Sequence, residues 1–135
     1  MTEKEIILIK RSWRLLQGVD SALIGDVFYS KLFNETPSLR KLFPKEMEGQ
    51  QVKLIEMLNY IVTKIDKIDK LIEDITAMAK RHIDYGAKPI HYQKVGEALL
   101  WTLEKGLGND WNEPLASAWQ NCYKLLSKTM LAVEK

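Results

Sequence analysis

The sequence predicts an all-α protein, and two patterns carry that prediction. Apolar residues recur three and four positions apart along almost every segment, and no segment shows the sustained alternation typical of a half-buried strand. Glycines and prolines stand between several of these segments, where they end one helix or start the next. At 135 residues the chain has the length of one domain, residues 1–135, with enough apolar residues for one core.

Two helices are predicted at the N-terminus. Thr2 and Glu5 have the spacing of a capping box, so the first helix is expected to start there and to end before Gly18. One face of this helix carries Ile6, Ile9, Trp13 and Leu16. A second helix is expected over about residues 21–34, and its apolar residues are Ile24, Val27, Phe28, Tyr29 and Leu32.

Pro37 predicts a new start, because proline suits a first helical turn and disfavours helix in the residue before it. A short segment, PSLRKLF, ends at Phe43. After the polar stretch KEMEG, a long helix is expected over about residues 50–65, with Leu54, Leu58 and Ile61 facing inward. The charged run KIDKIDK that follows is interpreted as a solvated helix end or connection.

His82, one of two histidines, lies in a helix expected over about residues 71–85. This helix ends at Gly86, since a residue without Cβ can take the left-handed turn, and Pro89 supports the break. Two longer helices are expected over about residues 91–107, ended by Gly108, and from about residue 112 to the C-terminus.

Composition excludes several classes of function. The net charge of +2 is dispersed along the chain, so nucleic acid is not an expected partner. The N-terminus resembles neither a signal peptide nor a membrane span, which predicts a cytoplasmic protein without a membrane partner. Cys122 has no second cysteine to pair with and is expected to pack in a helix. The sequence also lacks CxxCH, HExxH and phosphate-loop motifs.

The order of several short segments is familiar. They are Trp13, FYSKLF, Pro37, KLFP, Gln50 with Leu54, RHIDYG, HYQKVGEALLWTLEKGLG and WQNCY. With these segments the chain resembles a globin along essentially its whole length, most of all the bacterial single-domain haemoglobins and the haem domains of flavohaemoglobins, with some likeness to neuroglobin. The resemblance implies about seven helices in a three-over-three sandwich around non-covalent haem b. It also implies that the helix between Phe43 and Gln50 is reduced or absent.

The resemblance implies that His82 is the proximal ligand of the haem iron. Met78, one turn earlier, is expected to pack under the porphyrin, with Val95 and Leu99 as further cofactor contacts. Tyr92 and Glu134 correspond to the tyrosine and glutamate that surround the proximal histidine of flavohaemoglobins. Lys88 and His91 are expected at the propionate edge, although an exposed loop pair is an equal alternative.

On the distal side, the resemblance points to Tyr29 and Gln50 as hydrogen-bonding residues. Gln51 is the alternative to Gln50, and choosing it would replace Leu54 by Ile55 as the apolar wall. Gln50 is preferred because it places Leu54 and Leu58 on the same inward face. The resemblance also places Lys53 near a propionate and Phe43 against the macrocycle. For Tyr29, the alternative is a packing role with its hydroxyl in water.

These residues predict reversible binding of O2 and of other diatomics such as CO and NO. A tyrosine donor favours tight O2 binding and NO detoxification over passive oxygen transport. One alternative is a nitric oxide dioxygenase working with an external reductase, and another is a haem-free regulatory domain. Because Gln50 is a poor haem ligand, the ferrous iron is expected to be five-coordinate. The expected assembly is a monomer or weak dimer.

Overall fold

The computed structural model describes residues 1–84 and 88–133, and the side chains of residues 1–81 and 88–133. Within these ranges the chain forms six α-helices and two 3-10 helices, without strands, which confirms the all-α prediction. In chain order they are α1 (Glu3–Leu16), α2 (Ser21–Glu35), η1 (Pro37–Leu42), α3 (Glu48–Lys64), α4 (Ile68–Asp84), α5 (Pro89–Leu107), η2 (Gly108–Asp110) and α6 (Glu113–Val133).

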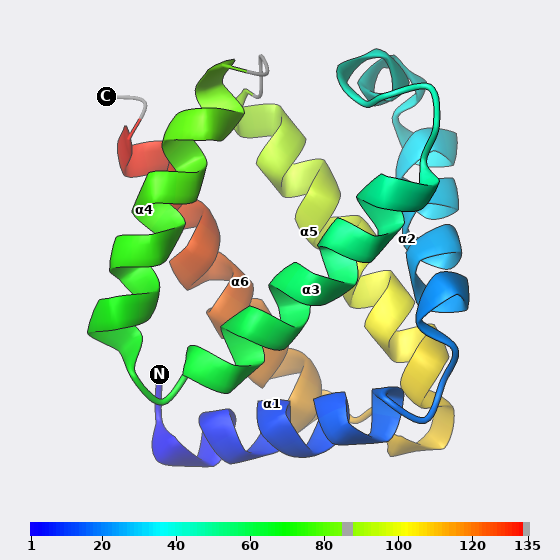
Figure 1. Cartoon of the computed structure of the whole chain (residues 1–135). Helices are drawn as coiled ribbons and strands as arrows, with labels where there is room; N and C mark the ends of the chain where they lie inside the picture. The colour runs from blue at the N-terminus through cyan, green and yellow to red at the C-terminus, as the bar shows by residue number, and fades with distance from the viewer. Residues whose placement is uncertain (85–87, 134–135) are drawn as a thin grey trace.

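The helices pack across the chain rather than in sequence order. α2 lies against α5 and α3, while α4 and α1 both lie against α6. In Figure 1, α3 and α4 form the front of the molecule, α5 and α6 run behind them, and α1 crosses the bottom. The C-terminal end of α4 and the start of α5 therefore lie at the same end of the molecule as the 3-10 segment after α2.

Local signals set two of the helix ends as predicted. The Glu5 amide donates to the Thr2 hydroxyl at 3.1 Å, and the Thr2 amide donates to the Glu5 carboxylate at 3.0 Å, which together form the capping box of α1. α5 ends where Gly108 takes a positive φ of 54°, a conformation that costs glycine little. Only residues 65–67 of the charged run form a connection, because Lys64 ends α3 and residues 68–70 already belong to α4. α4 therefore begins three residues earlier than predicted.

The segment between Phe43 and Glu48 forms no helix, which confirms the expected reduction. α3 begins two residues earlier than predicted, because the Gln51 amide already donates to the Met47 carbonyl at 2.9 Å. The short 3-10 turn that follows α5, η2, was not predicted from the sequence.

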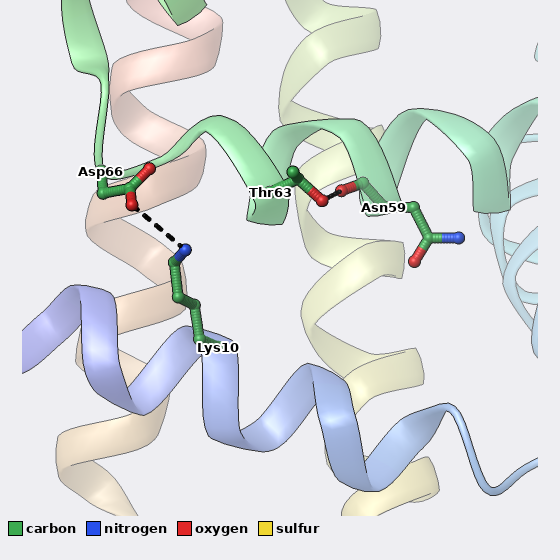
Figure 2. A network of polar contacts seen from close by, with 4 residues as sticks. All are labelled: Lys10, Asn59, Thr63 and Asp66. Carbon is green, nitrogen blue, oxygen red and sulfur yellow. Dashed lines mark hydrogen bonds and ion pairs between the residues drawn. The ribbon is translucent and has the colours of Figure 1, made fainter.

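Polar contacts attach α1 to α3 at the edge of the core. Figure 2 shows Lys10 of α1 paired with Asp66 in the turn after α3, with 3.5 Å between the Lys10 Nζ and the carboxylate. Further along, the Trp13 indole N–H donates to the Asn59 side-chain oxygen at 2.6 Å. None of the helices in the described part of the chain is long and apolar enough to cross a membrane.

Candidate functional site

Four aromatic rings gather where α2 meets the segment after η1. Tyr29 is 6% exposed, and its ring lies 4.8 Å from that of Phe28. It stacks on Phe33 at 5.8 Å and meets Phe43 edge to face at 5.5 Å, centroid to centroid. Phe33 and Phe43 are themselves 5.4 Å apart. The two aromatic residues expected in the distal pocket, Tyr29 and Phe43, are therefore neighbours, as such pairs prefer.

The Tyr29 hydroxyl lies inside the fold. It donates to the Gln50 backbone carbonyl of α3 at 3.5 Å, which is long for an O–H···O bond. Burial raises the pKa of the phenol, so it keeps its proton at neutral pH. The low exposure of the residue and the bond from its hydroxyl to the Gln50 carbonyl favour a hydroxyl inside the fold over the alternative in which it sits in water. Tyr29 can thus act as a neutral donor beside the start of α3.

The crossing of α2 and α3 separates the two glutamines. Gly25 of α2 faces Gln51: a Cβ built on Gly25 would lie 2.9 Å from the Gln51 Cβ and 3.2 Å from its Cγ. The Gln51 stem is therefore packed against the neighbouring helix, while the backbone of Gln50 faces Tyr29. This geometry favours Gln50 as the distal glutamine. Leu54 and Ile55 both pack half-buried against the core, so burial does not distinguish them as the wall.

Lys53 lies in α3 with its side chain exposed to solvent, where its charge can reach a group at the edge of the site. Leu58, one turn after Leu54, is 4% exposed and belongs to the core. The start of α3 thus presents apolar side chains inward and a lysine outward, which is the amphipathic arrangement that the sequence predicted.

The proximal residues lie on α4 and α5. His82 is in the last turn of α4, but its side chain lies outside the described residues, as does Glu134. Met78, one turn before His82, is buried with 8% exposed. On α5, Tyr92 and Leu99 are buried with 6% and 7% exposed, and Val95 packs half-buried against the core. Met78, Tyr92 and Leu99 are therefore buried side chains of α4 and α5, and their place around a haem stays a prediction.

His91 has a local partner at the start of α5. The Lys88 amide donates to the His91 Nδ1 at 2.9 Å, so this ring nitrogen satisfies one of the free amides of the first turn. Such a bond assigns the ring proton to Nε2. Lys88 itself is exposed. Both residues lie near the surface, and only the Nε2 of His91 is left for a further partner.

Tyr123 of α6 was not predicted from the sequence as a residue of this region. Its hydroxyl donates to the Tyr92 carbonyl, and its ring lies against Gly96, where an added Cβ would be 2.4 Å from the Tyr123 Cε2. Burial, and then the nearby Tyr92, raise the pKa of Tyr123, so the phenol is neutral. The glycine one turn after Tyr92 is the only signal that could have pointed to this close approach.

A model of the globin family matches residues 26–130 of the chain, and the chain therefore belongs to the globin family. It is similar to an uncharacterized globin-like protein of Aquifex aeolicus, with 31% identity over 135 residues that cover 100% of this chain and 95% of that protein. A flavohemoprotein of Vibrio cholerae is 28% identical over a region that covers 97% of this chain and 34% of the flavohemoprotein. The chain thus spans about a third of that relative.

The fold agrees with this membership. A solved structure of an engineered carbene transferase, made from a candidate nitric oxide dioxygenase of Rhodothermus marinus, superposes with a TM-score of 0.82 at 30% identity. The superposition covers 95% of this chain and 89% of that structure. The predicted globin fold is therefore confirmed.

The described residues fit a haem by their chemistry. Phe43, Leu54, Met78, Val95 and Leu99 are buried or half-buried apolar side chains, which suit a porphyrin face. The neutral Tyr29 phenol is a buried donor whose present bond to the Gln50 carbonyl is long. The single O–H hydrogen of this phenol can be donated to another acceptor only in exchange for its bond to Gln50.

Proposed function

We propose that this globin binds one non-covalent haem b and, at the haem, reversibly binds O2 and other diatomics such as CO and NO. His82 would hold the iron from the proximal side, and Tyr29 and Gln50 would line the distal side. When bound, the haem supplies an iron with an open position for a diatomic gas. We further propose that residues 1–135 act as a single globin domain.

The observation that carries this proposal is the buried, protonated Tyr29. Its ring packs against Phe33 and Phe43 in a residue that is 6% exposed, and a donor shielded from water in this way makes a stronger hydrogen bond. In the proposed complex, the phenol would exchange its 3.5 Å bond to the Gln50 carbonyl for a bond to the bound gas. Because a dioxygen ligand carries partial negative charge, this donor favours O2 over CO and slows O2 release.

Slow O2 release favours NO detoxification over oxygen transport. Two similar proteins are named for related chemistry: one is a flavohemoprotein, and the other derives from a candidate nitric oxide dioxygenase. The flavohemoprotein is about three times the length of the matched region, since the chain covers 34% of it. Turnover as a nitric oxide dioxygenase would need electrons from a reductase, which we propose as a partner of this chain.

The absorption spectrum of the dithionite-reduced protein, with and without CO, tests the proposal. Wild type is expected to show a five-coordinate ferrous band that shifts when CO binds, and His82→Ala is expected to weaken or change that band. His91→Ala is the matched control, because it removes the other histidine, whose Nδ1 caps α5. A wild-type protein that stays colourless after haem is supplied would favour a haem-free regulatory domain instead.

The same preparation tests the distal donor. Tyr29→Phe keeps the ring contacts and removes the hydroxyl, so the O2 dissociation rate should rise by about fivefold or more, as expected for the loss of a hydrogen bond worth at least about 1 kcal/mol. A fast O2 dissociation rate that is the same in wild type and Tyr29→Phe would contradict the assignment of Tyr29 as the donor to bound O2.

A further inference from the structure

Arg40, in the short 3-10 helix η1, joins three backbone carbonyls of the segment that follows it. Its Nη1 donates to the Pro44 carbonyl at 2.9 Å and to the Phe43 carbonyl at 3.4 Å, and its Nη2 donates to the Lys45 carbonyl at 2.9 Å. Three carbonyls of consecutive residues thus converge on one guanidinium. We propose that Arg40 is a positioning residue that holds the Phe43 ring against Tyr29.

The three bonds from Arg40 to the carbonyls of residues 43–45 are called the clamp below. They hold a segment that has no helix of its own. Residues 43–47 lie between η1 and α3, so the carbonyls of Phe43, Pro44 and Lys45 do not face helical amides. A guanidinium offers five N–H donors in a fixed plane, which lets one side chain serve all three carbonyls. A lysine carries the same charge as a single point and cannot reproduce that fork.

The guanidinium of Arg40 also contacts an aromatic ring. The Arg40 Cζ lies over the Phe33 ring at 5.5 Å from its centroid, a distance at which a cation and an aromatic face attract. Phe33 in turn contacts both Tyr29 and Phe43. Arg40 therefore connects the backbone after η1 with the aromatic cluster on α2.

The consequence concerns the orientation of the Tyr29 phenol. Phe43 meets the Tyr29 ring edge to face, and Phe43 is carried by the backbone that Arg40 holds. Without the clamp, the three carbonyls would be free to turn toward water, and Phe43 would lose its fixed contact with Tyr29. In the globin pocket proposed above, Phe43 would also lose its fixed place against the macrocycle, and only this last point rests on the proposed function.

The first test uses the protein without haem. The chain has three phenylalanines, so labelling with 4-fluorophenylalanine gives three 19F signals, which can be assigned by replacing each ring with leucine. In Arg40→Met the Phe43 signal should move toward the value of a solvent-exposed ring, while the buried Phe28 signal stays. Arg40→Lys should behave like Arg40→Met, because charge alone does not make the clamp. Lys41→Met, an exposed change in the same 3-10 helix, should leave all three signals in place.

An unmoved Phe43 signal in Arg40→Met, or a wild-type signal in Arg40→Lys, would overturn the clamp. Circular dichroism of each variant shows whether the helices are retained. If Arg40→Met does not fold, Arg40→Lys and hydrogen exchange of the Phe43 amide, which donates to the Arg40 carbonyl at 3.2 Å, carry the same test. Faster exchange of this amide is expected in the lysine variant, and unchanged exchange would count against the clamp.

The second test uses the haem-loaded protein. Arg40→Met should speed the transfer of haem to an acceptor globin by about threefold or more, and should broaden the C–O stretching band of the CO complex. In a Phe43→Leu background the same change should have little further effect, because residues that act as one unit are not additive. A full effect of Arg40→Met in that background would contradict a role through Phe43. A protein that takes up no haem but shows the 19F shifts would keep the clamp and reject the proposed function.

Discussion

At the scale of single residues, Gly96 controls how closely α5 can approach α6. The ring of Tyr123 fills the space where a side chain would stand, and its hydroxyl is tied to the Tyr92 carbonyl, so the ring cannot turn away without losing that bond. Gly96→Ala would place a Cβ 2.4 Å from the Tyr123 Cε2 and 2.8 Å from its Cδ2. We expect a loss of about 1–3 kcal/mol in the free energy of unfolding, the usual cost of overpacking. Urea denaturation followed by circular dichroism measures it.

Gly49 provides the matched control. It lies in the first turn of α3, and an added Cβ would meet no atom within 4 Å. Gly49→Ala should therefore leave the free energy of unfolding unchanged or raise it slightly, since alanine favours helix more than glycine does. If Gly96→Ala also left the free energy of unfolding unchanged, the ring of Tyr123 would be free to move.

Some residues of the candidate site could be predicted and others could not. Tyr29 and Phe43 were predicted because their resemblance to globin positions is local in sequence, and the structure brings their rings to 5.5 Å. The role of Arg40 depends on where a long side chain turns, and that of Tyr123 depends on a bond to Tyr92, 31 residues earlier. Residue spacing does not determine which groups the Arg40 and Tyr123 side chains contact, so these two contacts are known only from the structure.

At the scale of helices, the side-chain amide of Asn59 in α3 accepts two hydrogen bonds from α1 and its C-terminal end. The Asn59 side-chain oxygen accepts from the Trp13 indole at 2.6 Å and from the Gln17 amide at 3.3 Å. Asn59→Ala would leave the indole N–H of Trp13, which is 4% exposed, without this partner. The expected loss is about 1–3 kcal/mol in the free energy of unfolding, as for an unsatisfied buried donor.

The ion pair between α1 and the turn after α3 should matter less. Lys10 and Asp66 lie 3.5 Å apart with 37% and 53% of their side chains exposed, and Figure 2 shows that Thr63 separates this contact from Asn59. Lys10→Ala should cost less than about 1 kcal/mol, because water and salt screen the pair. Denaturation of both variants at low and high salt compares them. A larger, salt-sensitive loss in Lys10→Ala would mean that charge, not the indole bond, attaches α1.

Helix positions were easier to predict than helix contacts, for a physical reason. The capping box at Thr2 and the positive φ of Gly108 act within a few residues, so the sequence shows them directly. The start of α3 and the turn η2 depend on single backbone bonds, such as that from Gln51 to the Met47 carbonyl, and were misplaced or missed. The bond between Trp13 and Asn59 joins residues 46 positions apart, and periodicity carries no information about such pairs.

At the scale of the whole molecule, α6 holds the fold together. It packs against α1, α4 and α5, and the buried Trp119 indole donates to the Ser12 hydroxyl of α1 at 2.9 Å. Cys122, one turn after Trp119 on α6, is 2% exposed. A reagent can reach its sulfur only if α6 separates from its neighbours, and that separation removes most of the core.

Labelling of Cys122 should therefore report global unfolding. Burial raises the pKa of its thiol to about 12, so at pH 8 the folded protein keeps the unreactive protonated form, while the unfolded chain returns to the ordinary thiol pKa. We expect a disulfide reagent to modify native protein only through unfolding, with the same free energy as circular dichroism gives in denaturant. Lys124→Cys in a Cys122→Ala background is the control, since Lys124 is exposed on the same helix and its thiol should react at once. The labelling rate of Cys122 gives the free energy of the opening that exposes its sulfur. If this free energy were clearly smaller than that of global unfolding, α6 would open locally, and the rest of the fold would not depend on it.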